Sequence, residues 1–249
     1  MSFVCTGTLC CIVLCARLCF AATPDVESAQ SILERADQIR FPRHGFQVDV
    51  SIRSSAPDRQ IEIRKYRILT KGNENTVVMI TEPAAEKGQM MLMKARDLWI
   101  FVPSVSQPVR LSLGQRLTGQ VANGDLARSN FTGDYTPQIL RTDTIDGENY
   151  KVLELNAVDR SVTYSKVIYW VNQTNFRPYK AEFYSLSNRL LKTCRYEAYQ
   201  EQAGAMRPTR LVMEDALRKG EESVLEYSAM QLRDLPDRVF TKDYLNRLQ

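Results

Sequence analysis

The sequence GQMMLMKARDLWIFVP, residues 88–103, decides the fold of this chain. Two short apolar runs, Met90–Met93 and Leu98–Val102, flank a polar segment at Lys94–Asp97, and this pattern predicts a β-hairpin. Its apolar side chains are large, and several are methionines, whose flexible thioethers adapt to variable partners. No catalytic residue type dominates the hairpin, so it indicates apolar contact rather than bond chemistry.

Strand patterns continue on both sides of the hairpin. From Gly45 to Arg53, apolar and polar residues alternate, which is typical of a half-buried strand. Further strands are predicted at residues 61–69, 76–80, 109–113, 150–155, 162–171, 180–185, 190–196, 209–215 and 223–227. Short strands joined by turn residues predict an antiparallel sheet that is curved or closed.

Three segments depart from this rhythm. Residues 24–39 carry apolar side chains at the spacing of an amphipathic helix, which Pro42 would end. Residues 115–140 have a weak strand pattern and several Gly, Asn and Asp residues, so we expect a long loop or lid insertion there. Residues 235–248 are expected to dock as a final amphipathic turn.

The first 22 residues have the composition of an export signal. They contain no acidic residue and end in small residues, so we expect a signal peptide cleaved near Ala21 or Ala22. A membrane anchor and lipidation of a leader cysteine are the alternatives. Five of the six cysteines lie in this leader and only Cys194 follows it, so the mature chain would have no internal disulfide. We expect residues 23–249 to form a single domain.

The overall composition is that of a soluble globular protein. Hydrophobic residues make up 44% of the 249 residues, charged residues make up 25%, and the formal net charge is +4. This charge is small and evenly scattered along the chain. We therefore expect no nucleic-acid partner.

The sequence offers little for catalysis. Histidine-based catalysis needs an orienting partner and a nucleophile, and no such set accompanies the single histidine, His44. A Cys/His metal site is excluded because only His44 and Cys194 remain in the mature chain. A carboxylate-only site remains an alternative to surface-turn roles for Asp125, Asp134, Asp143 and Asp146. Phosphate-binding, dinucleotide-binding and nucleophile-elbow motifs are missing, so we expect neither an enzyme nor a cofactor.

Several sequence blocks resemble the LolA-like outer-membrane lipoprotein-sorting proteins of Gram-negative bacteria. They are Gly88–Met93 with Leu98–Pro103, Gln115–Gly119, Asn123–Arg128, Tyr169–Val171 with Phe176–Pro178, Lys180–Tyr184 and Leu235–Phe240. The long segment at residues 123–135 is similar to a divergent branch of this family. The resemblance implies an α+β fold, mainly β: a strongly curved, incomplete antiparallel β-barrel. An N-terminal helix and lid segments would cover its hydrophobic cavity.

The same resemblance implies a function. Such proteins are periplasmic carriers that shield lipoprotein acyl chains or lipids and deliver them toward the outer membrane. The expected partners are an inner-membrane export complex as donor and an outer-membrane acceptor, with the carrier itself a monomer. Two alternatives stay open: a lipid-sensing regulatory module of an export system, and a hydrolase of envelope lipids or glycans.

The residues expected to line the cavity are large and apolar and come from the helix and the strands. They are Ile32, Leu33, Val48, Val50, Met79, Met91, Met93, Trp99, Phe101, Phe183 and Leu225. Arg43, just after the helix, is expected to latch the lid through backbone carbonyls, and a solvated arginine is the alternative reading. Which strand face looks inward stays open, because a shift of one residue exchanges the two faces.

Overall fold

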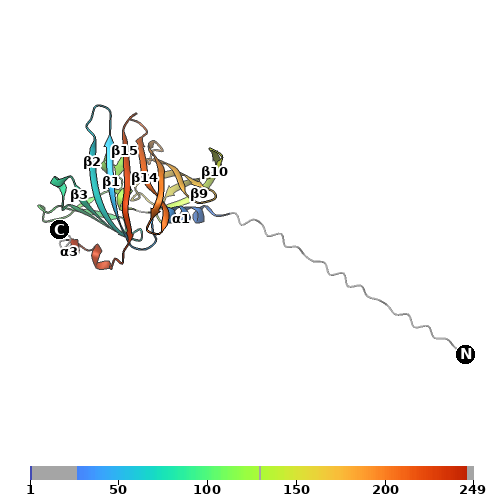
Figure 1. Ribbon diagram of the computed structural model, residues 1–249, viewed down its shortest axis with the longest axis horizontal. Coiled ribbons are helices and arrows are strands. Elements are labelled where there is room, and N and C mark those ends of the chain that lie inside the picture. Colours follow the sequence, from blue (N-terminus) through green and yellow to red (C-terminus); the bar gives the residue numbers. More distant parts are fainter. Residues whose placement is uncertain (2–26, 129, 246–249) are drawn as a thin grey trace.

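The computed structural model describes Met1, residues 27–128 and residues 130–245. Thirteen antiparallel strands form one strongly curved sheet, whose interior is covered by the N-terminal helix (Figure 1). The edge strands are β6 (Val109–Leu111) and β9 (Tyr135–Ile145), which do not pair with each other, so the barrel is open. The expected fold class, an incomplete antiparallel barrel with helices, is confirmed.

The strand order in the sheet is β6-β5-β4-β3-β2-β1-β15-β14-β13-β12-β11-β10-β9. The first and last strands pair directly, which makes the centre of the sheet continuous. The remaining strands are β1 (Phe46–Ser55), β2 (Glu62–Lys71), β3 (Asn75–Glu82), β4 (Met90–Lys94), β5 (Asp97–Phe101), β10 (Glu148–Ala157), β11 (Lys166–Asn172), β12 (Pro178–Tyr184), β13 (Leu190–Gln202), β14 (Ala205–Asp215) and β15 (Glu222–Leu232).

Short elements complete the fold. A small second sheet consists of β7 (Arg116–Thr118) and β8 (Val121–Ala122), followed directly by α2 (Asn123–Ala127). The other short elements are η1 (Ala84–Glu86), η2 (Asp237–Phe240) and α3 (Lys242–Leu245). Among the residues that the structure describes, no helix is long and apolar enough to cross a membrane.

The N-terminal helix α1 (Ala29–Arg40) confirms the helix expected at residues 24–39, although residues 24–26 lie outside the described part of the chain. Ser28 caps the helix by accepting a hydrogen bond from the backbone N–H of Ser31 at 3.1 Å. The helix ends at Arg40, two residues before Pro42. It packs against β9, β12 and β14 and places its apolar side in the interior of the barrel.

The hairpin of β4 and β5 shows why Met90–Met93 is continuously apolar. Met91 and Met93 face the interior, whereas Met90 and Leu92 face outward and pack against residues 235–245. Because both faces of this strand are buried, apolar side chains are favoured at every position and polar residues do not alternate with them. The fully buried Phe240 anchors this outer cover, as expected for a docked C-terminal turn.

The segment at residues 113–134, here called the inner segment, packs several buried side chains into the barrel, whereas its residues 114–116 are exposed. Leu113, Val121, Leu126 and Ala127 belong to the same buried cluster as the inward side chains of the sheet. The long loop expected at residues 115–140 is therefore only partly irregular, because it contains β7, β8 and α2 and ends where β9 begins. The sequence did not predict β9, because this edge strand is largely exposed and its apolar and polar residues do not alternate.

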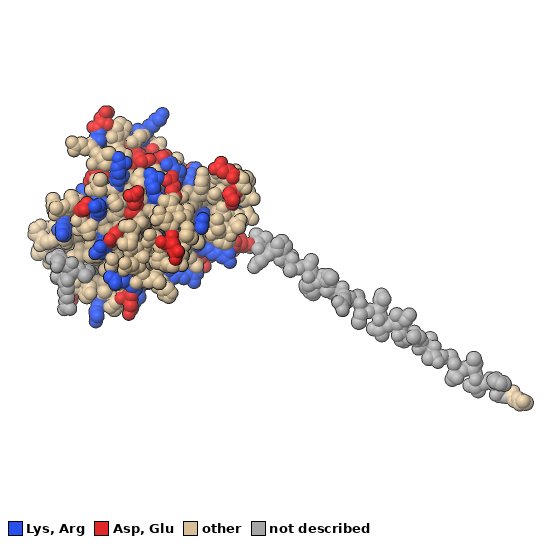
Figure 2. Space-filling view, viewed as in Figure 1, with Lys and Arg blue, Asp and Glu red and all other residues tan. Residues whose placement is uncertain are grey.

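One predicted strand is too long. The strand expected at residues 162–171 begins only at Lys166, and Val162 and Tyr164 instead lie buried in the turn before it. Their apolar character comes from packing against the inner segment rather than from strand pairing. The expected leader lies outside the described residues apart from Met1. Acidic and basic side chains are interspersed over the face drawn in Figure 2.

Gly119 fixes how closely the inner segment approaches the sheet. Its φ is +50°, and a Cβ there would collide with the hydroxyls of Ser54 and Ser223, which hydrogen-bond each other at 2.8 Å. The backbone N–H of Gln120 donates to Ser223 Oγ at 2.9 Å. Any side chain at position 119 would push the inner segment away from β1 and β15.

We predict that Gly119→Ala destabilises the protein more than Gly204→Ala. Both residues have positive φ, but a Cβ at Gly204 meets no neighbouring atom. Both variants therefore carry a backbone cost of about 1–2 kcal/mol, and only Gly119→Ala adds an overpacking cost of about 1–3 kcal/mol. Equilibrium unfolding in urea measures the difference. Equal losses would show that the inner segment is not held against the sheet at this point.

Candidate functional site

The interior of the barrel is lined by aromatic and aliphatic side chains. Phe131 of the inner segment lies among them, with ring centroids 5.2 Å from Tyr169, 5.5 Å from Tyr135 and 6.5 Å from Phe183. The other large inward residues are Tyr66, Tyr164, Tyr196, Tyr227, Met91, Met93, Met213 and Leu225. The interior is therefore an apolar chamber that Phe131, α1 and α2 occupy.

Little empty space remains in this chamber. The cavity beside Arg40, Phe131 and Tyr164 has a volume of about 30 Å³, and a second one beside Phe46 and Val48 has about 10 Å³. Pockets that hold drug-sized ligands usually have roughly 300–1,000 Å³. The chamber can admit an acyl chain only if α1 or the inner segment moves.

Asp37 ties α1 to the inner segment. Its carboxylate accepts hydrogen bonds from the backbone N–H of Phe131 at 3.1 Å, the backbone N–H of Thr132 at 2.8 Å and the Thr132 hydroxyl at 2.7 Å. The side chain is only 4% exposed. Burial raises the pKa of the Asp37 carboxyl, and Arg40 together with these donors opposes the rise.

Two arginines fix the end of the helix. The Arg40 guanidinium lies 3.4 Å from the Asp37 carboxylate and 4.5 Å from the centroid of the Phe131 ring. Arg207 of β14 donates to the backbone carbonyls of Gln38 at 2.7 Å and Ile39 at 3.3 Å. These carbonyls lack partners within the helix, so a buried cation there satisfies the C-terminal turn.

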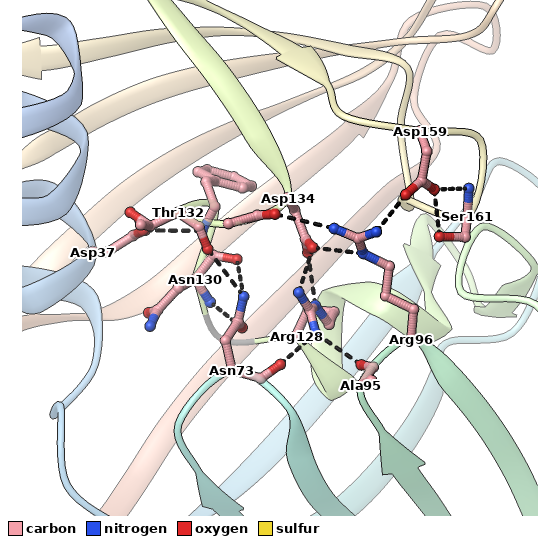
Figure 3. A network of polar contacts seen from close by, with 12 residues as sticks. Asp37, Asn73, Ala95, Arg96, Arg128, Asn130, Thr132, Asp134, Asp159 and Ser161 are labelled. Atoms are coloured by element: carbon pink, nitrogen blue, oxygen red, sulfur yellow. Dashed lines mark hydrogen bonds and ion pairs between the residues drawn. The ribbon is translucent and has the colours of Figure 1, made fainter.

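A polar clasp holds the same end of the inner segment to the β2–β3 and β4–β5 turns (Figure 3). Arg128 and Asp134 form a buried ion pair, and Arg96 of the β4–β5 turn also donates to Asp134 at 3.0 Å. Arg96 also forms an ion pair with Asp159, which lies between β10 and β11 in the other half of the sheet. The Asn73 side chain accepts from the Asn130 backbone N–H at 3.0 Å and donates to its carbonyl at 3.1 Å.

A second buried ion pair lies deeper in the chamber. Lys192 Nζ of β13 is 2.5 Å from the Asp125 carboxylate, and the two side chains are 5% and 7% exposed. The Tyr164 hydroxyl donates to the same carboxylate at 3.0 Å. Burial raises the pKa of Tyr164 well above its usual value, so this phenol remains a neutral donor. Burial also raises the pKa of the neighbouring Cys194 thiol to about 12, which makes the thiol unreactive at neutral pH.

The structure brings together most of the residues expected to line a cavity. Those that reach the interior are Ile32, Leu33, Val48, Val50, Met91, Met93, Phe183 and Leu225. Met79 and Phe101 instead pack with the outer cluster, and Trp99 pairs with outward-facing Leu92 and shares its face. These three residues lie outside for one reason. Both faces of β3 and β5 carry large apolar side chains, so the size of a side chain does not show which face of the sheet it occupies.

Arg43 does not occupy the position expected of a latch. It is exposed, and none of the side-chain hydrogen bonds found among the described residues involves it. The helix is held instead by Asp37, Arg40 and Arg207, which the sequence analysis did not single out. Asp37 and Arg40 lie on the buried side of the helix, together with its apolar residues. A charged residue at a buried helix position needs a polar partner, and this could have identified them from the sequence.

Comparisons with known proteins agree with this geometry. A family model described as "-like: Uncharacterized protein" matches residues 72–247. The chain is similar to a LolA superfamily protein from Nitrosomonas europaea at 68% sequence identity and a TM-score of 0.85, covering 88% of this chain and 99% of that chain. No curated protein sequence matches significantly.

Two more distant solved structures share the fold at 19% identity. One is a DUF1329 family protein from Desulfovibrio piger, with a TM-score of 0.75 and coverage of 87% of this chain and 97% of that chain. The other is a candidate outer membrane lipoprotein-sorting protein domain from Vibrio parahaemolyticus, with a TM-score of 0.73 and coverage of 88% and 98%. High identity over nearly the whole length of the Nitrosomonas relative shows that this chain belongs to the LolA superfamily.

Proposed function

We propose that this protein is a periplasmic carrier that shields lipoprotein acyl chains or other lipids in its chamber and delivers them toward the outer membrane. The observation that carries the proposal is the construction of the chamber. Its wall is the apolar inner face of one sheet, and its contents are segments held by discrete polar contacts. Kinship with the LolA superfamily and the lipoprotein-sorting description of the Vibrio domain support the same role.

The energetics of such a carrier are balanced. Burying an acyl chain contributes about 0.8 kcal/mol per methylene group, so ten methylenes contribute about 8 kcal/mol. Each hydrogen bond to a charged group that must open costs about 1.5–3 kcal/mol. Releasing the three Asp37 hydrogen bonds to Phe131 and Thr132 therefore costs about 4.5–9 kcal/mol, which is of the same order as the contribution of ten buried methylenes. A balance of this kind permits both loading and release.

The alternative function as an envelope hydrolase requires a reactive polar cluster in the chamber. The cluster present there consists of Lys192, Asp125 and Tyr164, whose polar atoms bond to one another and to the backbone of the inner segment. No serine or histidine is among the hydrogen-bond partners found for these three side chains in the described residues. Their contacts favour a role in holding the inner segment.

Removing the Phe131 ring should increase the affinity for an acyl ligand. In Phe131→Ala the inner segment makes fewer apolar contacts with the sheet, so moving it to admit a ligand costs less free energy. We expect a fluorescent acyl probe to bind about tenfold more tightly, which is equivalent to about 1.4 kcal/mol. Trp99→Ala is the matched control, because Trp99 lies on the outer face and its loss should leave the affinity unchanged. A wild-type protein that binds no acyl probe and purifies without lipid would contradict the carrier function.

Locking α1 to the inner segment should prevent loading. The Thr132 hydroxyl donates to Asp37 Oδ2 at 2.7 Å, so these two side chains meet, and the double variant Asp37→Cys, Thr132→Cys is designed to cross-link α1 to the inner segment. Residues 1–22 are omitted from this variant because they contain the five leader cysteines. The oxidised form should lose probe binding, and reduction of the same sample should restore it. Cys194 should not interfere, because its thiol is buried. Unchanged binding after confirmed disulfide formation would show that α1 and the inner segment need not separate.

A further inference from the structure

Lys192 is a buried cation whose hydrogen-bond partners are unevenly distributed. Its ammonium donates to the Asp125 carboxylate at 2.5 Å, to the Gln120 carbonyl at 2.6 Å and to the Met213 sulfur at 3.4 Å. Asp125 and Gln120 belong to the inner segment. The sheet itself supplies only the weak sulfur acceptor and the ring of Phe183, 5.3 Å away, and the Tyr164 ring lies at 5.1 Å.

This asymmetry matters when the chamber opens. An acyl chain can enter only if α1 or the inner segment moves, and movement of the inner segment would take Asp125 and Gln120 with it. Lys192 would stay behind on β13 with the Met213 sulfur as its remaining hydrogen-bond acceptor among those the described residues provide. A buried ammonium without a partner is strongly unfavourable, so the loaded state needs a new acceptor beside Lys192.

A hollow of about 250 Å³ reaches Lys192 from the surface. Arg116, Arg189 and Arg218 line it, and its one carboxylate, Asp215, already accepts the backbone N–H groups of Leu217 and Arg218. Arg218 also contacts the Glu221 carboxylate at 3.4 Å, so part of its donor capacity is already used. Lysine and arginine heads still outnumber carboxylates in the wall of the hollow. Two of the three arginines, Arg189 and Arg218, lie in turns of the main sheet and would remain if the inner segment moved.

The hollow and the chamber share a wall. Tyr164 borders both the 250 Å³ hollow and the 30 Å³ inner cavity, and Asp125, the partner of Lys192, borders the inner cavity. A ligand with a charged head and an apolar tail could therefore place its head in the hollow and its tail in the chamber.

We propose that the ligand is an anionic amphiphile, whose phosphate or carboxylate head replaces Asp125 as the partner of Lys192 while its chain fills the chamber. Arg189 and Arg218 hold the outer side of the head. This inference rests on the proposed carrier function and names the chemical class of its cargo. Charge-assisted hydrogen bonds from lysine and arginine to such oxyanions are strong and directional, so they would select an acidic head over a neutral one.

The test compares ligands of equal chain length in the full chain. Dodecyl phosphate, dodecanoic acid, dodecanol and inorganic phosphate each compete with a neutral fluorescent acyl probe. We expect both acidic amphiphiles to bind at least tenfold more tightly than dodecanol, and inorganic phosphate not to displace the probe. Equal affinities for acid and alcohol would overturn the proposal while leaving the carrier function intact. If no amphiphile binds, the carrier function fails and the proposal fails with it.

A double variant, Asp125→Asn with Lys192→Met, removes both charges at once and so leaves no lone buried charge. It should lose the tenfold preference for dodecyl phosphate over dodecanol, and this ratio is the readout because removing contacts that hold the inner segment also changes the absolute affinity for dodecanol. Lys219→Met makes the same substitution at an exposed lysine and should keep the preference. A preference that persists in the double variant would overturn the assignment of Lys192. The wild-type affinity ratio remains decisive even if the double variant does not fold.

Inorganic phosphate separates a lipid head from a free anion. Isothermal titration that detects phosphate binding as tight as that of dodecyl phosphate would identify a site for free anions and overturn the amphiphile. Raising the salt concentration should weaken the contribution of the exposed arginines, Arg189 and Arg218, more than that of buried Lys192. The residual preference at high salt therefore measures the Lys192 contact.

Discussion

The apolar inner face of an open, curved sheet is the constraint on which the whole structure depends. A sheet that curves without closing has a large concave face, and that face must be covered to keep it from water. In this protein α1 and the inner segment provide the cover from within. Every polar contact in the chamber can be understood as a means of holding these two pieces in an apolar place.

The way these pieces are held differs from ordinary core packing. The apolar contacts of Phe131 and Leu126 are non-directional, whereas Asp37, Arg207 and Lys192 bind particular backbone or side-chain atoms. Buried polar contacts of this kind define one closed arrangement, and breaking any of them is costly unless another group takes its place. Under the proposed carrier function, an anionic ligand would take that place beside Lys192. The cover is therefore both part of the core and the part of the core most suited to exchange.

How far the sequence predicted this structure depends on the element. The alternating strand at residues 45–53 and the amphipathic helix were correctly predicted because each has one buried face, and period reveals it. Met91 and Met93 face the interior, although the sequence left the direction of this strand open. Met79, Trp99 and Phe101 were expected inside and lie outside, because the C-terminal turn covers the outer face of β3–β5 and makes it as apolar as the inner one.

The sequence by itself determined the number and kind of most strands, the helix and the apolar character of the hairpin at residues 88–103. These are local properties, because they follow from the spacing of apolar and polar residues along the chain. Only the tertiary structure decided which face of that hairpin looks inward and that the inner segment packs its buried side chains into the chamber. It also decided that Asp37 and Lys192 hold the inner segment, while Arg207 holds the end of α1. Those features depend on contacts between residues far apart in sequence, such as Asp37 with Thr132 and Lys192 with Asp125. No local pattern encodes such distances.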